Sequence, residues 1–292
     1  MTAKVISIIN MKGGVGKTTL TKEIGFHLSF IEHKRVLLID TDPQANLTQS
    51  FYRRFNYRQA DALSPEVEQG NENYIIQSAS INNLYKANSG VPPIRKDLIV
   101  DFPNISLSLI PGDLNTVFME VNTGSADMSQ SIVNYLRFNE QYDILNQYDY
   151  VLIDCPPTYS AYTIAATLAS DAYLIPVRPD EYSILGITML NKVVSDIELK
   201  NKAILRGKRP ANLGVIFTDI TDHPGKGISD TMAQIRKSSG LSDNYFFRSV
   251  FLKNNGFFKS LKYFVDLSNS TRSKENLTAL IAELSSRIGD LL

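Results

Sequence analysis

Short runs of aliphatic residues alternate along the chain with longer stretches in which apolar residues recur every three or four positions. The runs 36–39, 150–153 and 172–175 are apolar throughout, which is typical of parallel strands buried on both faces. Further strands are predicted at 5–9, 105–110 and 213–217, and helices at 18–31, 128–145, 182–203, 230–237 and 271–292. This β-α-β rhythm predicts an α/β fold, a mostly parallel twisted sheet with helices on both faces.

The segment from about 53 to 101 departs from this rhythm. It contains two loop-like stretches, Gln69–Asn73 and Gly90–Pro93, and a helix is predicted between them over 73–87. No repeat or low-complexity tract divides the chain. We therefore expect one domain over residues 1–292, with an elaboration at about 53–101 and a basic C-terminal third at 192–292.

A glycine-rich stretch, Asn10–Thr19, directly follows the first strand and opens the first helix. In that context, successive backbone N–H groups and the helix N-terminus form a cradle for phosphates, and glycine lets the backbone approach them closely. Lys17 would pair with the β- and γ-phosphates of a nucleotide, and the Thr18 hydroxyl would ligate Mg²⁺.

The plain Walker pattern has a glycine five positions before Gly16, where this chain has Met11 followed by a second lysine, Lys12. The sequence K-G-G-V-G-K-T-T resembles the deviant Walker A motif of the ParA/MinD/Soj ATPases, and the resemblance runs from Lys4 to about Gly225. It implies a P-loop NTPase fold that binds ATP and Mg²⁺, with Lys12 reaching the nucleotide of a second subunit. The implied nucleotide-binding residues of this loop are Lys12, Gly13, Gly14, Val15, Gly16, Lys17, Thr18 and Thr19.

Aspartates follow two of the predicted strands. Asp40 and Asp42 end one and Asp154 ends another, at the sheet edge where open α/β folds bind ligands. Taken alone, Asp40 fits a strand-capping turn at Pro43 equally well. The stretch D-T-D-P-Q, however, resembles the family element whose first aspartate positions the attacking water, which implies that role for Asp40. Asp42 would support the Mg²⁺ shell or the switch geometry, and Asp154 resembles the Walker B aspartate that contacts Mg²⁺ through water.

Two further strand ends resemble the family's loops at the nucleotide base. They place Pro176 and Arg178 after one strand and Thr218 after another, although turn residues without a ligand are also common there. The resemblance implies catalysis by Lys12, Lys17 and Asp40. An ATPase whose site is complete only in the dimer would be slow, with ATP favouring the dimer and hydrolysis dissolving it.

Charge is divided unevenly along the chain, although 30 basic and 30 acidic residues sum to zero. Residues 1–191 hold 14 Lys/Arg and 20 Asp/Glu, net −6, and residues 192–292 hold 16 and 10, net +6. Such a division is a hint of a nucleic-acid partner, although a solvated charged face would look the same. The candidate DNA-binding residues are Lys200, Lys202, Arg206, Lys208, Arg209, Lys226, Arg236 and Lys237.

Several classes of protein are disfavoured by composition. One cysteine, Cys155, provides no disulfide framework and no cluster ligands, which argues against a reductase resembling the nitrogenase iron protein. No apolar run reaches about 18 residues and no signal peptide is recognisable, so we expect a cytoplasmic protein. The first strand begins near residue 4, which disfavours an N-terminal helix-turn-helix.

Within the resembled family, the favoured function is that of a partition ATPase. It would be a homodimer on ATP that binds DNA non-specifically, associates with the nucleoid, and segregates plasmid or chromosomal DNA with a ParB-type partner. A ParA-like ATPase that positions a protein cargo, and a MinD-like membrane regulator of cell division, are alternatives. The last ten residues, Glu283–Leu292, carry two acidic residues and one basic, net −1, which suits anionic lipid poorly and favours a helix packed on the sheet. A dethiobiotin-synthetase-like ligase would need a substrate constellation that the sequence does not display.

Overall fold

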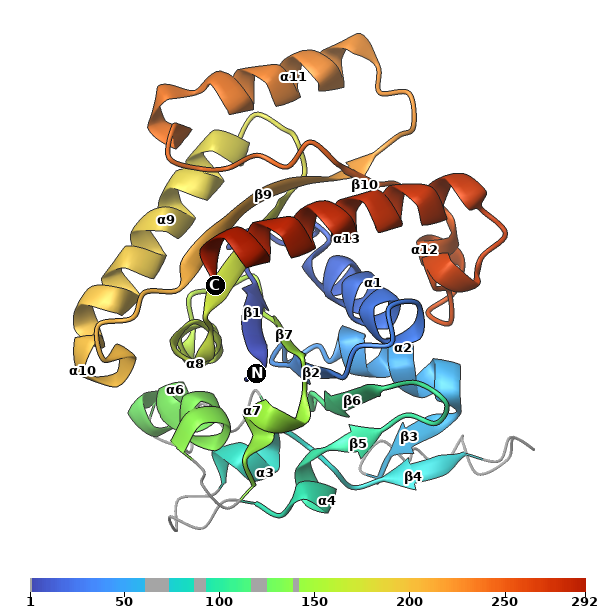
Figure 1. Ribbon diagram of the computed structural model, residues 1–292, viewed down its shortest axis with the longest axis vertical. Coiled ribbons are helices and arrows are strands. Elements are labelled where there is room, and N and C mark those ends of the chain that lie inside the picture. The colour runs from blue at the N-terminus through green and yellow to red at the C-terminus, as the bar shows by residue number, and fades with distance from the viewer. Residues whose placement is uncertain (1, 61–73, 87–92, 117–124, 139–141) are drawn as a thin grey trace.

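A mostly parallel sheet forms the centre of the molecule (Figure 1). The computed structural model describes residues 2–60, 74–86, 93–116, 125–138 and 142–292, and only the backbone of 125–127 and 258. Within those residues the sheet has eight strands in the order β10-β9-β8-β1-β7-β2-β6-β5, all parallel except the edge pair β5–β6. They are β1 (Lys4–Ile8), β2 (Val36–Asp40), β5 (Val100–Asp101), β6 (Leu107–Ile110), β7 (Tyr150–Asp154), β8 (Ala172–Val177), β9 (Ala211–Ile220) and β10 (Phe251–Leu252).

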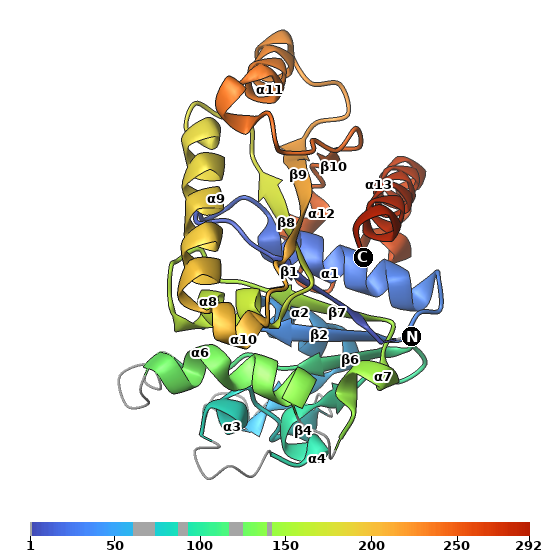
Figure 2. The ribbon, with the colours of Figure 1, turned by 60° about the vertical axis from the view of Figure 1, so that its left-hand side comes forward.

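Both faces of the sheet are covered, and the strand sequences show why. In β2, Leu37 and Ile39 join the core on one face, and Val36 and Leu38 join the core on the other. On the second face lie α1 (Lys17–Phe30), α2 (Asn46–Phe55) and α13 (Thr271–Leu291). On the first lie α3 (Asn82–Tyr85), α6 (Ser125–Val133), α8 (Ala161–Ala169), α9 (Ser183–Lys200) and α11 (Lys226–Lys237). Figure 2 shows α9 and α13 on opposite sides of β8 and β9, so the predicted fold class is confirmed.

One predicted helix, over 128–145, is wrong as a single element. The α-helix α6 ends at Val133 and continues as a π-helical turn, Asn134–Phe138. A separate turn, α7 (Ile144–Gln147), follows Asp143, whose φ of 42° is left-handed and cannot be part of a continuous right-handed helix. The Asp143 carboxylate instead accepts hydrogen bonds from the Asn146 amide nitrogen, at 2.8 and 2.9 Å.

The helix predicted over 73–87 is also wrong within the described part of that range. Residues 75–77 form a strand, β4 (Ile75–Gln77), paired in parallel with β3 (Tyr57–Gln59), and only α3 is helical. The ends of the predicted helix, Asn73 and Ala87, lie outside the described residues. The structure of this region depends on pairing between strands that lie 18 positions apart in the sequence, as Tyr57 and Ile75 do. Local periodicity does not reveal such pairing.

The other predicted elements shift only at their ends. The helix predicted over 182–203 is α9 followed by a separate turn, α10 (Lys202–Leu205), and the strand predicted over 213–217 extends to Ala211–Ile220. The remaining short elements are α4 (Arg95–Leu98), α12 (Gly256–Lys259) and two 3₁₀ turns, Ser239–Leu241 and Val265–Leu267.

The C-terminal helix α13 packs on the sheet, as predicted. Its apolar stripe is buried against β9, β10 and α1, namely Leu277, Leu280, Ile281, Leu284 and Ile288. Its Glu283 carboxylate accepts hydrogen bonds from the backbone N–H groups of Arg248 (2.7 Å) and Ser249 (2.9 Å). Over the described residues, no helix has the length and apolar character needed to span a bilayer.

Candidate nucleotide site

The glycine-rich loop lies between β1 and α1 at the carboxyl edge of the sheet. Gly14 and Gly16 adopt φ angles of 71° and 83°, which only glycine enters without strain. A Cβ placed on Gly14 would meet nothing within 4 Å, so the loop presents an open backbone surface. Because Gly16 caps α1 without a side-chain partner, the first N–H groups of the helix remain directed at this space.

Lys17 is held in the loop by burial and by the backbone of Lys12. Its side chain is buried, and its Nζ donates a hydrogen bond to the Lys12 carbonyl oxygen at 3.1 Å. Burial lowers the pKa of Lys17 below its ordinary value, and the nearby carboxylate of Asp154 offsets part of that shift. A buried ammonium with one neutral partner is suited to an anionic ligand, as predicted for the β- and γ-phosphates.

Asp40 and Asp154 lie side by side. They occupy paired positions on the adjacent parallel strands β2 and β7, and both are fully buried. Burial first, and then the charge of Asp40, raise the pKa of Asp154 well above its ordinary value, although the nearby Thr18 hydroxyl opposes the shift. The structure thus brings together three residues that lie far apart in the sequence, Thr18, Asp40 and Asp154.

The surroundings of Asp154 fit a divalent cation. Its Oδ1 lies 3.5 Å from Thr21 Oγ1, whose shorter hydrogen bond goes to the Lys17 carbonyl oxygen (3.0 Å), and its Oδ2, though buried, has no hydrogen-bond partner among the described residues. An unpartnered buried carboxylate oxygen beside a threonine hydroxyl is an arrangement that a hard cation completes. No three His, Cys, Asp or Glu side chains converge on one point among the described residues, so phosphate oxygens and water would supply the rest of the shell.

Asp40 is held by partners that sequence reasoning missed. Its Oδ2 accepts hydrogen bonds from the backbone N–H of Thr48 (2.9 Å) and from Thr48 Oγ1 (2.7 Å). Thr48 Oγ1 in turn accepts a bond from the Gly112 N–H at 2.8 Å. A Cβ on Gly112 would come within 2.9 Å of Asp40 Cγ, so the glycine is required by close approach. Burial raises the pKa of Asp40 to about 7.

Asp42 lies in a turn rather than against the other two acids. Its backbone N–H donates to Asp40 Oδ1 at 3.3 Å, and its Oδ1 accepts from the Gln44 N–H at 2.9 Å. Its charge still contributes to the pKa shifts of Lys17 and Asp154. A role of Asp42 in the Mg²⁺ shell or in switch geometry remains a prediction.

Two of the residues predicted at the nucleotide base, Pro176 and Thr218, contact the glycine-rich stretch Asn10–Thr19. The Asn10 amide nitrogen donates to the Pro176 carbonyl oxygen (2.8 Å), and Thr218 Oγ1 donates to the Val15 carbonyl oxygen (2.8 Å). Arg178 reaches Asp219 at 2.9 Å between side-chain nitrogen and oxygen. Thr19 lies in the first turn of α1 and is partly exposed.

Asp219 and Lys253 were not predicted at the nucleotide site, but both lie at this edge of the sheet. Lys253 Nζ is 3.8 Å from Asp219 Oδ1, so Asp219 lies between two cations from the ends of β8 and β10. A cavity of about 720 Å³ lies beyond them, lined by Lys253, Asn254 and Tyr263 among others. Only the position of Asp219 directly after Thr218 could have indicated it, because β10 is too short to recognise from sequence.

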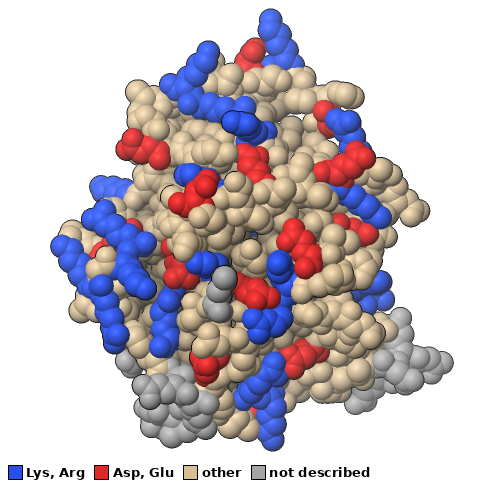
Figure 3. All heavy atoms as spheres, viewed as in Figure 1, with Lys and Arg blue, Asp and Glu red and all other residues tan. Residues whose placement is uncertain are grey.

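The candidate DNA-binding residues fall into two separate groups. Figure 3 shows Lys and Arg side chains gathered over α9 and α10 on the left flank, and others over α11 at the top. The α9–α10 group is Lys200, Lys202, Arg206, Lys208 and Arg209, and the α11 group is Lys226, Arg236 and Lys237. In Figure 1, α10 follows the C-terminal end of α9 and α11 lies near its other end; α9 has 18 residues and is therefore about 27 Å long.

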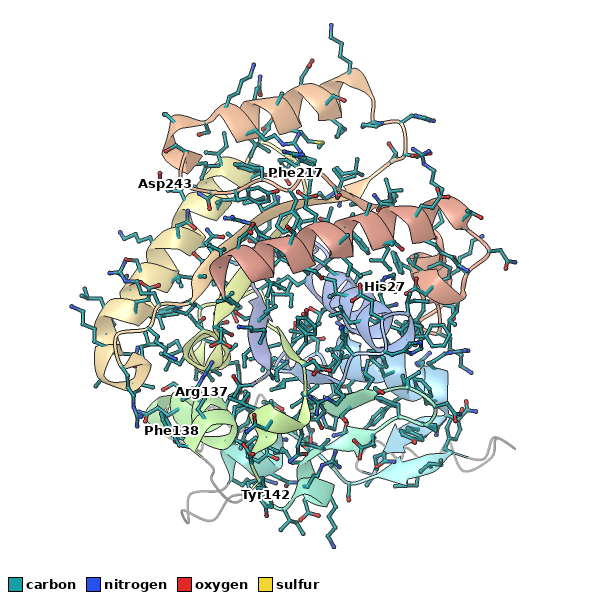
Figure 4. The ribbon with its side chains drawn as sticks, in the orientation of Figure 1. His27, Arg137, Phe138, Tyr142, Phe217 and Asp243 are labelled. Atoms are coloured by element: carbon teal, nitrogen blue, oxygen red, sulfur yellow. The ribbon has the colours of Figure 1, made fainter. Side chains whose placement is uncertain are left out.

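Some of these cations already contact other groups of the chain. Arg209 Nε is 3.6 Å from Glu198 Oε2, and the Arg206 guanidinium lies 4.8 Å from the ring centre of Phe138 (Figure 4). Arg236 donates to the Phe247 carbonyl oxygen at 3.1 Å and lies over the Phe217 ring. A cavity of about 340 Å³ between α9 and α10 is lined by Lys202, Lys208 and Arg209.

Comparison with known proteins agrees with this geometry. A family model described as "AAA domain" matches residues 3–206. The virulence plasmid ParA family protein pGP5-D of Chlamydia psittaci is 30% identical over 216 residues, which cover 74% of this chain and 69% of that protein. This chain belongs to the ParA/MinD/Soj family of P-loop ATPases.

Other members of the family are similar over shorter stretches. The sporulation initiation inhibitor protein Soj of Bacillus subtilis is 33% identical over 192 residues, 65% of this chain, and the match spans 64% of Soj, slightly under two thirds. The chromosome partitioning protein ParA of Caulobacter vibrioides is 28% identical over 197 residues, 66% of this chain and 63% of that protein.

Solved structures show the same fold at lower identity. The ATP complex of a Cyanothece McdA variant gives a TM-score of 0.72 at 20% identity, covering 97% of this chain and 96% of McdA. A plasmid partition protein of Borrelia burgdorferi with bound AMPPNP gives 0.70 at 21% identity, covering 99% and 100%. A P-loop ATPase fold therefore extends over nearly the whole chain.

Proposed function

We propose that this protein is a partition ATPase. It binds ATP with Mg²⁺, forms a homodimer on ATP, holds DNA without sequence preference and associates with the nucleoid. A ParB-type partner stimulates its slow hydrolysis during segregation of plasmid or chromosomal DNA. The observation that carries this proposal is the convergence of Lys17, Thr18, Asp40 and Asp154 at the glycine-rich loop.

The chemistry follows from which groups are fixed and which are left unpaired. Thr18 and Asp154 would hold Mg²⁺, with Asp42 as a further candidate, and Mg²⁺ would neutralise charge on the phosphates. Lys17 would hold the β- and γ-phosphates. Asp40 would orient the attacking water, because two bonds from Thr48 fix its Oδ2 and leave Oδ1 with only the longer bond from Asp42.

A homodimer would account for two exposed features at the same edge. The side chain of Lys12 points away from Lys17, although its carbonyl oxygen accepts the Lys17 hydrogen bond. Its Nζ lies 6.0 Å from the ring centre of Tyr182. Tyr182, Leu185 and Met189 are 68%, 59% and 54% exposed, and they form one apolar stripe along the start of α9. A second copy would cover this stripe and receive Lys12, which the family resemblance assigns to the partner's nucleotide.

The DNA-binding part of the proposal rests on the two basic groups. Phosphate contacts by Lys and Arg supply affinity that is independent of sequence, and pairing of two chains doubles the cations presented to one duplex. Binding should therefore be tight only in the ATP state.

Binding to random-sequence DNA, followed with ATP, with ADP and without nucleotide at several salt concentrations, tests this. We expect ATP-dependent binding whose logarithm falls with the logarithm of salt, by about 0.9 for each phosphate contacted. Lys202→Glu with Lys208→Glu, and Lys226→Glu with Lys237→Glu, should each weaken binding and flatten that slope. Lys34→Glu with Arg53→Glu, which reverses two exposed cations outside the basic third, is the matched control. Binding that is independent of ATP, or absent, would contradict the proposal.

A further inference from the structure

Lys12 is engaged by a carboxylate of its own chain. Its Nζ forms an ion pair with Asp180 Oδ2, across the gap between the glycine-rich loop and the end of β8. The side chains are 39% and 33% exposed, so the pair lies at the surface of the carboxyl edge. The proposed function needs this same ammonium at the nucleotide of another chain, and the pair therefore holds it away from that task.

Asp180 is prepared for this contact by its own loop. Its Oδ1 accepts hydrogen bonds from the Tyr182 N–H (3.1 Å) and Ser183 Oγ (3.2 Å). Ser183 is buried, and its single hydroxyl proton is shared between Asp180 Oδ1 and the Arg178 carbonyl oxygen, which lies 2.8 Å from Oγ. One carboxylate oxygen is thus fixed by the turn, and the other is presented to Lys12. Although partial burial raises it, hydrogen bonds from Lys12, Tyr182 and Ser183 lower the pKa of Asp180 below its ordinary value.

The backbone of Lys12 is fixed as well, so only its side chain can exchange partners. Its N–H donates to Asn10 Oδ1 at 2.9 Å, and its carbonyl oxygen accepts from Lys17 Nζ at 3.1 Å. An exposed ion pair contributes little to folding, so the fold does not depend on this one. A weak ion pair of this kind competes with the nucleotide of a second copy for the Lys12 ammonium, but it does not prevent Lys12 from moving to that nucleotide.

We propose that Asp180 is a positioning residue that keeps Lys12 on its own chain until the nucleotide of a second copy offers a stronger anion. The inference rests on the proposed ATP-dependent homodimer. Exchange of one carboxylate for a triphosphate gains more Coulomb energy than exchange for a diphosphate. Asp180 therefore adds the same cost to the transfer of Lys12 with either nucleotide, and ATP offsets that cost more fully than ADP.

Sedimentation of the full chain with AMPPNP–Mg²⁺ or ADP–Mg²⁺ across a range of protein concentrations tests this. Asp180→Asn keeps an Oδ1 acceptor for Tyr182 and Ser183 but removes the charge that holds Lys12. With AMPPNP, we expect the midpoint of dimerisation to move to about threefold to tenfold lower protein concentration. With ADP, the relative shift should be no larger, because the same ion pair is lost with either nucleotide.

Three variants make the result specific. Glu181→Gln removes a neighbouring exposed carboxylate and should behave as the unmodified protein. Asp180→Glu keeps the charge and should restore most of the unmodified midpoint, even if Asp180→Asn folds poorly. In a Lys12→Ala background, Asp180→Asn should have no further effect, because the pair is already broken.

The outcomes separate the two proposals. If the unmodified protein dimerises with AMPPNP and Asp180→Asn dimerises equally or less well, the holding role of Asp180 is wrong and the proposed function stands. A weaker dimer would mean that Asp180 stays on Lys12 and supports it in the dimer. If the unmodified protein fails to dimerise with AMPPNP at any concentration, the proposed function fails, and the inference fails with it.

Discussion

Buried carboxylates occur beside the N-terminal end of α1 and in its middle, and the chain satisfies them differently. At the N-terminal end, Asp40 and Asp154 are fully buried beside one another, and Asp154 Oδ2 has no hydrogen-bond partner. Glu23 is equally buried. Its Oε2 accepts a hydrogen bond from the Val265 N–H at 2.9 Å, and its Oε1, which has no hydrogen-bond partner among the described residues, forms an ion pair with Lys22 Nζ at 3.1 Å. Burial raises the pKa of Glu23 to about 7, as it does for Asp40.

The second region completes its charges within the chain. Lys22 Nζ also donates to the Tyr263 carbonyl oxygen at 2.6 Å, and the buried His27 Nδ1 lies 3.1 Å from Asp266 Oδ2 (Figure 4). These contacts fix residues 263–266 on α1. Similar burial and a similar pKa thus accompany two different purposes. A buried charge that is paired internally stabilises the folded chain, and one that is left unpaired is available to bind a ligand.

The largest expected difference between the regions is in catalysis. Asp40→Asn should lower the rate of ATP hydrolysis by about 10²–10⁴-fold, because the water-orienting charge is lost. It should leave the stability of the nucleotide-free protein unchanged or raised, since a buried charge and its repulsion with Asp154 disappear. Turnover and chemical unfolding measure the two effects. A loss of several kcal/mol of stability would instead make Asp40 a structural residue.

The opposite result is expected at the internally paired region. Lys22→Met leaves the Glu23 carboxylate buried without its cation and should lower the free energy of unfolding by about 3 kcal/mol. Urea unfolding measures the loss, and Lys192→Met, which changes an exposed lysine on α9, provides the control. Equal unfolding midpoints for the two variants would show that the Lys22–Glu23 pair does not hold residues 263–266 on α1.

A ligand should stabilise the region that lacks internal partners. AMPPNP with Mg²⁺ at about one hundred times its Kd should raise the free energy of unfolding by about 2.7 kcal/mol. Chelation of Mg²⁺ by EDTA, or the substitution Asp154→Asn, should remove the Mg²⁺-dependent part of that gain. A gain that persists in Asp154→Asn would place the metal elsewhere.

The last expected difference is the pH dependence of stability from Glu23. Its folded pKa of about 7 lies above the unfolded value of 4.5, so the folded state binds the proton more tightly. The stability that this provides is complete below pH 4.5 and is lost as the pH rises through about 7. Glu23→Gln should flatten the pH dependence of the urea midpoint between pH 5 and pH 8 relative to the unmodified protein. Parallel profiles would mean that another group titrates there.

The parts of the fold and site that depend on neighbours in sequence were predictable. The glycine-rich loop needs only a strand, glycines and a helix start, and the aspartates after β2 and β7 had to share an edge because parallel strands align their ends. The helix predicted over 128–145 failed, because the left-handed backbone at Asp143 belongs to an irregular turn that apolar periodicity does not reveal. The prediction of a helix where β4 lies was wrong for a related reason, since the pairing of β3 with β4 joins distant segments and leaves little local pattern.

The sequence by itself determined the class of fold and the glycine-rich loop, because those follow from local pattern and strand order, and its resemblance to the family pointed to Lys12, Lys17, Asp40 and Asp154. The tertiary structure alone decided that Thr48 and Gly112 fix Asp40, that Asp180 holds Lys12, and that Lys22 pairs internally. It also placed the candidate DNA-binding residues in two groups, one over α9 and α10 and one over α11. The physical reason is that hydrogen bonds, ion pairs and burial depend on distances in space, and packing of segments far apart in the chain sets those distances.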